Sequence, residues 1–187
     1  MPNDTSKGTL TVSQLHAVAG DELLQLADVL CDCVAGNASV SFMQPFGRER
    51  ALAFWHDAAA GLVRGERVLL VARDESGIVG TVQLVLAQPE NQPHRADLVK
   101  LLVHRRARRQ GVAALLMQAA EHAAKDCGKT LLVLDTASSE AERVYERQGW
   151  LRVGAIPGYA LMPDGALCDT TYFYRDLRGM DAGSSPA

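Results

Sequence analysis

The chain has 187 residues, 48% of them hydrophobic and 22% charged, and its formal net charge at pH 7 is −3. These values are typical of one soluble globular domain that buries a sizeable core. A slightly acidic chain lacks the overall positive charge that draws a protein to nucleic acids or anionic membranes, so neither is an expected partner.

The cysteines and the N-terminal residues indicate a reducing compartment. The chain has four cysteines, without a CxxC pair or a zinc-type spacing of Cys and His, so we expect no metal site. Residues 1–10 lack the apolar core of a signal peptide, and no window approaches the roughly 20 apolar residues that cross a bilayer. We therefore expect a cytoplasmic protein with a single domain over residues 9–178 and flexible termini at 1–8 and 179–187.

Apolar spacing in the first half of the chain predicts two helices and then three strands. Apolar residues three and four positions apart are typical of amphipathic helices, and short runs rich in Val and Leu are typical of strands. The segment Asp74-Glu75-Ser76-Gly77 between two such runs is a hairpin signature. In chain order, the five elements cover residues 20–35, 48–63, 68–73, 78–87 and 96–104.

The second half predicts strands and helices in alternation. Residues 130–135 form a short, almost uniformly apolar run, which is typical of a strand in a parallel pair covered on both faces. Ser139-x-x-Glu142 matches a capping box at the start of a helix that runs to Gly149. The remaining elements are a helix at 112–127 and strands at 150–155 and 171–177. This order predicts an α/β sandwich around a mixed sheet.

Between the third strand and the next helix lies a basic turn, HRRARRQG, at residues 104–111. A helix start exposes unpaired backbone N–H groups and the positive end of the helix dipole, which together favour a phosphate. Gly111 has no Cβ, so a ligand can approach the backbone closely, and the small Ala113 keeps the first helical turn uncluttered. The turn therefore predicts an anion site. It lacks the spacing of a Walker or dinucleotide-binding loop, so it does not by itself identify the ligand.

Two other interpretations of this turn stay open. The first is a nucleic-acid-binding module, although the sequence places no aromatic residues beside the arginines for stacking on bases. The second is a solvated turn without a partner. The arginines concerned are Arg105, Arg106, Arg108 and Arg109.

Two segments resemble motifs of the GNAT N-acetyltransferase superfamily. ADLVKLLVHRRARRQGVAALLMQAA (96–120) resembles its acetyl-CoA motif, a strand followed by Gln/Arg-x-x-Gly-x-Gly/Ala, and LDTASSEAERVYERQGW (134–150) resembles its Tyr-x-x-x-Gly-aromatic signature. The motif positions are met by Arg108, Gly111 and Ala113, and by Tyr145, Gly149 and Trp150. The resemblance implies a GNAT-like fold: a central, mostly antiparallel sheet with one splayed parallel strand pair, flanked by helices.

Further segments are similar to the tabtoxin-resistance acetyltransferases, a bacterial subgroup that N-acetylates a small β-lactam toxin. They are GNASVSFMQ (36–44), LDTASSEAERVY (134–145) and PGYALMPDGAL (157–167). The resemblance implies acetyl transfer from acetyl-CoA to a primary amine of a small molecule, with an antibiotic or toxin-like amino-acid derivative as the first expectation. A protein or peptide N-acetyltransferase and a non-catalytic CoA sensor of the same fold are the alternatives.

The resemblance also implies how acetyl-CoA binds. The backbone of residues 101–103 would hold the pantetheine arm as though it were an extra strand, and amides from 109–114 would hold the pyrophosphate. Ser138 stands where many members of the superfamily carry an Asn that touches the cofactor. The implied cofactor-binding residues are Leu101, Leu102, Val103, Arg108, Arg109, Gln110, Gly111, Val112, Ala113, Ala114, Ser138 and Tyr145.

Acetyl transfer to an amine needs a base, because a primary aliphatic amine with a pKa of about 10.4 is protonated at pH 7. Asp97 lies eleven positions before Arg108, a spacing at which histone-type members of the superfamily carry a catalytic Glu. Four residues of strand from Asp97 to Leu101 span roughly 13 Å, so a water relay would be needed. Asp97 could instead pair with Lys100 or Arg95.

Asp135 is the second candidate base, at the end of the predicted parallel strand, where ligands of open α/β sheets bind. Its alternative role is that of a turn residue bonded to the following backbone. The resemblance makes Tyr145 the acid that protonates the departing thiolate, although its place on a helix face with Ala141 and Val144 could equally reflect burial. The oxyanion of the reaction needs a backbone N–H donor, which the open edge of residues 101–103 could supply.

Other predictions concern the acceptor pocket and the assembly. The residues that could shape the pocket, or simply pack, are Phe42, Trp55, Tyr159 and Asp164. The sequence leaves open whether the protein is a monomer or a homodimer.

Overall fold

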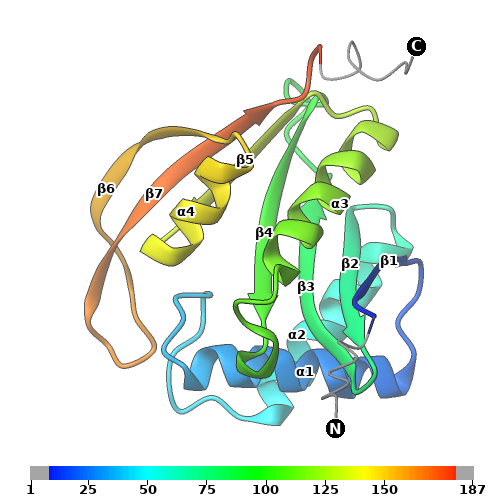
Figure 1. Cartoon of the computed structure of the whole chain (residues 1–187), viewed down its shortest axis with the longest axis vertical. Coiled ribbons are helices and arrows are strands. Elements are labelled where there is room, and N and C mark those ends of the chain that lie inside the picture. Colours follow the sequence, from blue (N-terminus) through cyan, green and yellow to red (C-terminus); the bar gives the residue numbers. More distant parts are fainter. Residues whose placement is uncertain (1–8, 180–187) are drawn as a thin grey trace, which may run out of the picture.

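The computed structural model describes residues 9–179, which fold around one seven-stranded sheet of order β1-β2-β3-β4-β5-β7-β6 (Figure 1). The strands are β1 (Thr11–Leu15), β2 (Arg67–Asp74), β3 (Gly77–Val85), β4 (Arg95–Val103), β5 (Leu131–Thr136), β6 (Leu151–Leu161) and β7 (Leu167–Asp176). The described helices are α1 (Gly20–Ala35), α2 (Arg48–Val63), α3 (Val112–Asp126) and α4 (Ser139–Arg147), with a short 3-10 turn η1 (Arg105–Ala107). None of these helices is long and apolar enough to cross a membrane.

Most of the predicted elements are confirmed. Both N-terminal helices have their predicted bounds, and the hairpin is confirmed by the pairing of Asp74 with Gly77. The exposed strand β1 was not predicted, and β6 and β7 are longer than the strands predicted at 150–155 and 171–177. The expected flexible termini lie outside the described residues, except for Gly179.

Alternating side chains divide the sheet into two faces. On one face, α3 packs on the strands, and Leu116 of α3 shares one core with Leu98 of β4. Tyr145 of α4 belongs to the same core. On the other face, α1 and α2 pack over a second core that contains Leu69 of β2 and the fully buried Trp55 of α2. We call these the α3 face and the α2 face. Figure 1 shows α3 and α4 on the near side of the sheet.

The strands β4 and β5 form the only parallel pair of the described sheet, and they pair over a short stretch. Their ladder runs from Arg95 with Leu131 to Asp97 with Val133, after which β5 continues beside β7. Figure 1 shows the two strands diverging beyond this point. The predicted mixed sheet with a splayed parallel pair is therefore confirmed, and one edge of β4 is left open beyond Asp97.

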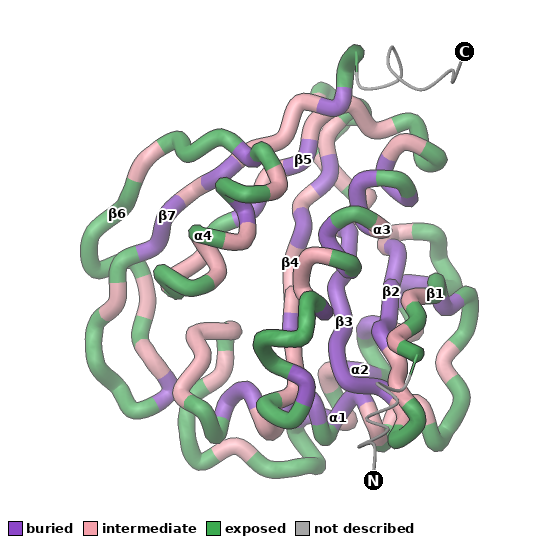
Figure 2. The backbone as a smooth tube through the Cα atoms, viewed as in Figure 1, coloured by how far each residue is buried: buried purple, intermediate pink, exposed green. Residues whose placement is uncertain are grey.

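The outer edge of the sheet is exposed. Strand β6 pairs with β7 on one side and is exposed along almost its whole length (Figure 2). The hairpin that follows it, residues 162–166, folds back onto the loop between α1 and α2. There Asn37 Nδ2 donates to Asp164 Oδ2 at 2.9 Å, and the Gln44 N–H donates to the Pro163 carbonyl at 2.9 Å. Two segments that are more than 100 residues apart thus meet beside the splay.

Candidate active site

A β-bulge in β4 sets the geometry of its open edge. Gln83 of β3 pairs with Val99, but Thr81 pairs with Leu102, so one residue of β3 faces two of β4. Lys100, inside the bulge, takes the left-handed conformation with a φ of 54°. A bulge bends its strand and shifts the alternation of side chains by one residue. Leu102 accordingly packs in the core of the α2 face.

The backbone of Leu101 and Val103 faces the open side of β4. The His104 N–H donates to a β3 carbonyl at 2.9 Å, and the alternation of an antiparallel ladder then directs the backbone groups of Leu102 toward β3 as well. The Val103 carbonyl accepts from Arg108 Nε at 3.2 Å. Of the three residues predicted to bind pantetheine, Leu101 therefore has the backbone groups best placed to bind an added strand-like ligand.

The turn between β4 and α3 presents backbone N–H groups to an open space. Arg109 and Gly111 both have positive φ angles, 61° and 85°. Gly111 is the N-cap of α3, which has neither a side-chain cap nor an acidic residue in its first turn. Left-handed residues before a helix start direct successive N–H groups into one concavity that binds anions. A Cβ built on Gly111 would meet no other part of the described protein within 4 Å, apart from its chain neighbours and the backbone of α3, so the backbone beside it is open to a ligand.

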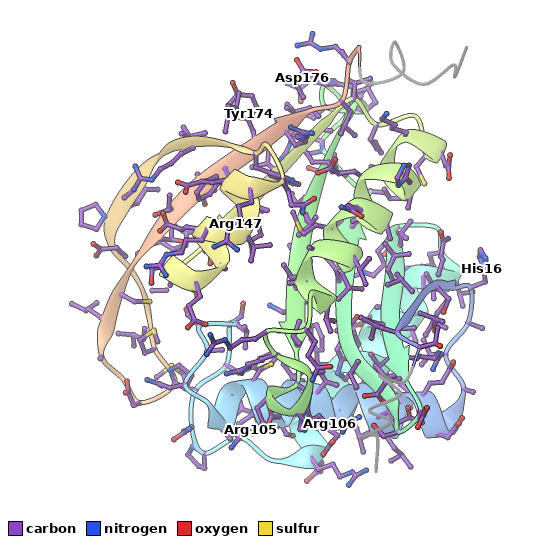
Figure 3. All side chains as sticks on the ribbon, in the orientation of Figure 1. His16, Arg105, Arg106, Arg147, Tyr174 and Asp176 are labelled. Carbon is purple, nitrogen blue, oxygen red and sulfur yellow. The ribbon has the colours of Figure 1, made fainter. Side chains whose placement is uncertain are left out.

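Three of the four arginines in this turn hold it to the rest of the protein. The Arg105 side chain pairs with Asp32 of α1, and Arg106 Nη2 donates to a β3 carbonyl at 3.1 Å. Figure 3 labels both residues beside α1, below the end of β4. Arg108 bonds to β4, as described above, and the Arg109 side chain makes no hydrogen bond or ion pair within residues 9–179. Of the four arginines, Arg109 therefore has the side chain most available to a ligand.

Tyr145 lies on the α3 face, and its hydroxyl bonds to the side chain of Thr136 at the end of β5. It is 5% exposed and packs against the rings of Trp150 and Phe173, with centroids 6.2 and 5.6 Å away. Burial raises the pKa of its hydroxyl well above the usual value and the charge of Asp135 adds to this, while a hydrogen bond with the Thr136 side chain opposes both. The phenol is therefore a neutral proton donor at physiological pH.

The start of α4 differs from the predicted capping box. Ser138 is the N-cap, and its Oγ accepts from the Ala141 N–H at 3.3 Å. Glu142 does not reach back to the cap but accepts from Thr171 Oγ1 at 2.9 Å, which ties α4 to β7. The predicted capping box at Ser139 is therefore wrong by one residue.

Asp97 and Asp135 lie on neighbouring strands of the α2 face and line one cavity of about 360 Å³. The backbone places them at different depths. Asp97 pairs with Val133, so Asp135 lies two residues, or roughly 7 Å, nearer the open end of the splay. Tyr172 of β7 also lines the cavity. The structure thus brings the two candidate bases together beside the open edge of β4.

The two carboxylates have different partners. Asp97 is paired with Arg95 and accepts from Gln88 Nε2 at 3.0 Å, so of its two predicted partners only Arg95 is present. Asp135 is exposed and accepts from Thr170 Oγ1 at 2.7 Å. Because Asp135 lies within β5, its interpretation as a turn residue is wrong. Asp135 is the carboxylate with more freedom to meet a ligand.

Of the four residues predicted to shape an acceptor pocket, some pack within the protein and others lie near residues of the site. Trp55 is fully buried in the α2-face core, and Asp164 joins the two loops. Tyr159 exchanges a 3.0 Å hydrogen bond with Tyr172; this bond, partial burial and the Asp135 charge raise the pKa of Tyr172 to about 12. Phe42 lies under the ammonium of Lys100.

Two residues of this region were missed by sequence reasoning. Tyr172 gave no signal, because its role depends on the pairing of β7 with β5. Lys100 did give a sequence signal, because it is the single charged residue between Asp97 and His104 in an apolar strand. No group of three or more potential metal ligands occurs in the described part of the chain.

The open edge of β4 suits an extended amide-containing arm, the Gly111 turn suits a pyrophosphate, and Tyr145 lies where the two strands part. This geometry defines the class of CoA-dependent acyltransferases. The sequence model of the acetyltransferase (GNAT) family matches residues 34–150, more than half of the chain, and the chain belongs to this family. It is an N-acetyltransferase that uses acetyl-CoA as the acetyl donor.

Relatives and solved structures agree. The chain is 31% identical over 133 residues to an uncharacterised N-acetyltransferase in the hisH-hisA intergenic region of Azospirillum brasilense, covering 70% of this chain and 77% of the relative. A ribosomal-protein-alanine N-acetyltransferase from Brucella melitensis has the same fold, with a TM-score of 0.76, 18% identity, and 89% and 99% of the two chains covered. A phosphinothricin acetyltransferase from Sinorhizobium meliloti, solved with acetyl-CoA, has a TM-score of 0.74, 16% identity, and 95% and 94% covered.

Proposed function

We propose that the protein transfers the acetyl group of acetyl-CoA directly to a primary amine of a small molecule, with an antibiotic or toxin-like amino-acid derivative as the first candidate. The observation that carries this proposal is the cavity of about 360 Å³ that Asp97 and Asp135 line beside the splay. Its volume is in the range of small-ligand pockets, and its carboxylates suit an ammonium group. The resemblance to the tabtoxin-resistance subgroup supports a small acceptor.

Acetyl-CoA would bind from the α3 side of the splay. The backbone N–H groups of 109–114 would hold the pyrophosphate, and Arg109, whose side chain has no other described partner, would add a charge-assisted bond. The backbone of Leu101 would hold the pantetheine arm, and Tyr145 would lie beside its sulfur. The remaining predicted contacts, from Leu102, Arg108 and Ser138, are weaker because these groups already bond within the protein.

The reaction divides between the two faces. Asp135 accepts a proton from the ammonium, directly or through water, and the neutral nitrogen attacks the thioester carbonyl. The Leu101 N–H stabilises the oxyanion that forms. As the carbon–sulfur bond breaks, Tyr145 gives its proton to the departing thiolate, which leaves as CoA. The attacking nitrogen then loses its second proton through water, which restores the Tyr145 phenol and leaves the new amide. Asp97, held by Arg95, orients the amine rather than taking its proton.

The alternatives are less well supported. A protein or peptide acceptor is favoured by the similarity in fold to the Brucella enzyme, whereas the cavity volume of about 360 Å³ favours a small amine. A nucleic-acid patch would need the arginines of the turn, three of which already bond within the protein.

Four unpaired cysteine thiols and the use of acetyl-CoA support a location in the cytoplasm.

The test is a screen for CoA release. Purified protein with acetyl-CoA is incubated with a panel of amines and amino-acid analogues and, in parallel, with peptides that have free N-termini, while free thiol is measured. Release with small amines is the expected result. Release with peptides alone would establish the peptide acceptor, and a rise in melting temperature with acetyl-CoA but no release with any amine would establish the CoA sensor.

A further inference from the structure

Lys100 places a positive charge inside the acceptor side of the site. The bulge in β4 turns its side chain to the α2 face, where Nζ donates to Ser41 Oγ at 2.9 Å. The ammonium also lies over the rings of Phe42 and Phe54, 5.7 Å from each centroid. The loop before α2 and α2 itself therefore surround the charged group, which holds it in a defined position.

This ammonium has no counter-ion within the described residues. No carboxylate of residues 9–179 lies within 4 Å of Nζ. Burial lowers the pKa of Lys100, the more distant charge of Asp135 opposes this, and the charge of Arg67 adds to it. A partly buried cation without an ion pair is costly, and the two aromatic rings offset only part of that cost. An anion brought by a ligand would remove that cost.

Neighbouring donors on the same face also lack acceptors. Arg67 Nη1 donates to Gln83 Oε1 at 2.8 Å, and this leaves Arg67 Nε and Gln83 Nε2 buried without a hydrogen-bond partner among the described residues. Gln83 is fully buried and pairs with Val99, the residue before Lys100. Arg67 thus adds a second positive charge on the α2 face and Gln83 Nε2 adds an unused donor, whereas Arg67 Nε lies against Gly61 of α2. These groups favour a negative group near them.

The Lys100 ammonium lies near the opposite charges of the cavity. Val99 lines the cavity together with Asp97 and Asp135, and Lys100, which is not part of the lining, follows Val99 in the strand. The charge of Asp135 acts on the Lys100 ammonium, so an amine held by Asp135 would lie near both groups. A ligand with one amine and one anionic group satisfies both ends, whereas a simple amine leaves the cation unpaired.

We infer that Lys100 is a specificity residue that binds a carboxylate of the acceptor, so that the acceptors are amines that also carry a carboxylate, as amino acids and their derivatives do. The inference rests on the proposed acetylation of a small amine. Arg67 and Gln83 keep the surroundings of Lys100 positive and donor-rich. Asp135 binds the reacting amine and Lys100 binds the second group.

The experiment compares matched acceptors with matched variants. Steady-state CoA release is measured with L-phenylalanine against 2-phenylethylamine and with L-methionine against 3-(methylthio)propylamine, using wild type, Lys100→Met and Lys100→Arg. Methionine keeps an unbranched stem over the two rings and makes the same backbone demand at the bulge. We expect wild type to favour the acid of each reactive pair at least about 10-fold in kcat/KM, the size of one lost charged hydrogen bond.

The Lys100 variants then show whether this residue causes the preference for the acid. Lys100→Met should abolish it through KM, with kcat for the acid nearly unchanged and the simple amine unaffected, and Lys100→Arg should restore it. Equal use of acid and simple amine by wild type would overturn the inference while leaving the proposed function standing. An equal fall in kcat for both acceptors would also overturn it, because Lys100 would then act on the reacting amine.

Two checks keep these outcomes separate. Lys100→Gln serves as a second neutral variant if Lys100→Met fails to fold, and the rise in melting temperature with acetyl-CoA shows that each variant retains an intact cofactor side. If no amine in the screen releases CoA with wild type, the proposed function itself is contradicted and the inference falls with it.

Discussion

The two faces of the sheet are built in different ways. On the α3 face, the Gly111 turn, the start of α3 and the adjoining strand come from one continuous segment, 95–126. On the α2 face, the cavity takes its residues from β3, β4, β5 and β7, and Lys100 meets side chains from the preceding loop and α2. A donor site made by one segment can be recognised from a motif, but an acceptor site made by five elements cannot.

The largest expected effect comes from breaking the α3 face alone. Gly111→Glu puts an L residue at a φ of 85° and a negative charge where the pyrophosphate would lie, so we expect the Kd for acetyl-CoA to rise about 1000-fold, or roughly 4 kcal/mol. Isothermal titration and the melting shift with acetyl-CoA measure this. Gly128→Glu is the matched control, since Gly128 has a φ of 69° just beyond the other end of α3. Equal losses in both variants would contradict the anion site.

Replacing each of the two carboxylates in turn tests the α2 face. We expect Asp135→Asn to lower kcat/KM about 100-fold at pH 7, because the ammonium loses its proton acceptor. Asp97→Asn, which leaves Asp135 in place, should cost less than about 10-fold. The deficit of Asp135→Asn should shrink as the pH rises toward the acceptor amine's own pKa of about 10, where the free amine no longer needs a base. The reverse ranking at pH 7 would make Asp97 the base.

Removing the Tyr145 hydroxyl from the α3 face has a smaller expected effect. Tyr145→Phe should lower kcat about 10-fold while the Kd for acetyl-CoA changes less than twofold, because only the proton for the departing thiolate is removed. Tyr174→Phe on the neighbouring strand β7 is the control and should be silent. If kcat is the same in Tyr145→Phe and wild type, the tyrosine is a core residue only.

The smallest effect is on stability at high pH. The pKa of Tyr145 is raised in the folded protein, so the folded state holds this proton more tightly than the unfolded state. Its contribution is complete below the unfolded value of about 10 and is lost as the pH rises above it, at up to about 1.4 kcal/mol per pH unit. Urea unfolding at pH 9 to 11 should show a shallower decline for Tyr145→Phe than for wild type. Identical slopes would mean that the phenol is not desolvated.

How much could be predicted from the sequence follows the same division. The 20–35 and 48–63 helices and the turn at Gly111 were found because their signals are local: a helical spacing of apolar residues and a glycine before a helix. The strand β6 was predicted too short because it buries neither face, so no alternation marks its length. Lys100 was considered only as a partner of Asp97, since a strict alternation gives no sign of a bulge.

The capping box shows that such an error can be as small as one residue. Ser138 and Ser139 are adjacent, and both precede a helix with acidic residues in its first turn. The residue three positions after Ser138 is Ala141, so the motif pattern favoured the wrong serine, while the backbone placed the cap one residue earlier. For α4 the sequence pattern missed the cap by one residue, which is enough for the fold and insufficient for a contact.

The extra residue in β4 reverses, from that point on, which side chains of the strand face each side of the sheet. Leu98 belongs to the core of the α3 face and Leu102 to that of the α2 face, although four residues of regular strand would have put both on the same side. Deleting Leu101 would restore the regular period, keep Leu102 in its core and move Lys100 to the α3 face. The number of residues in one strand thus decides which face receives the Lys100 charge, and a chain shortened by this residue would lose that charge from the acceptor side while keeping Arg108, Gly111 and Ala113 of its acetyl-CoA motif.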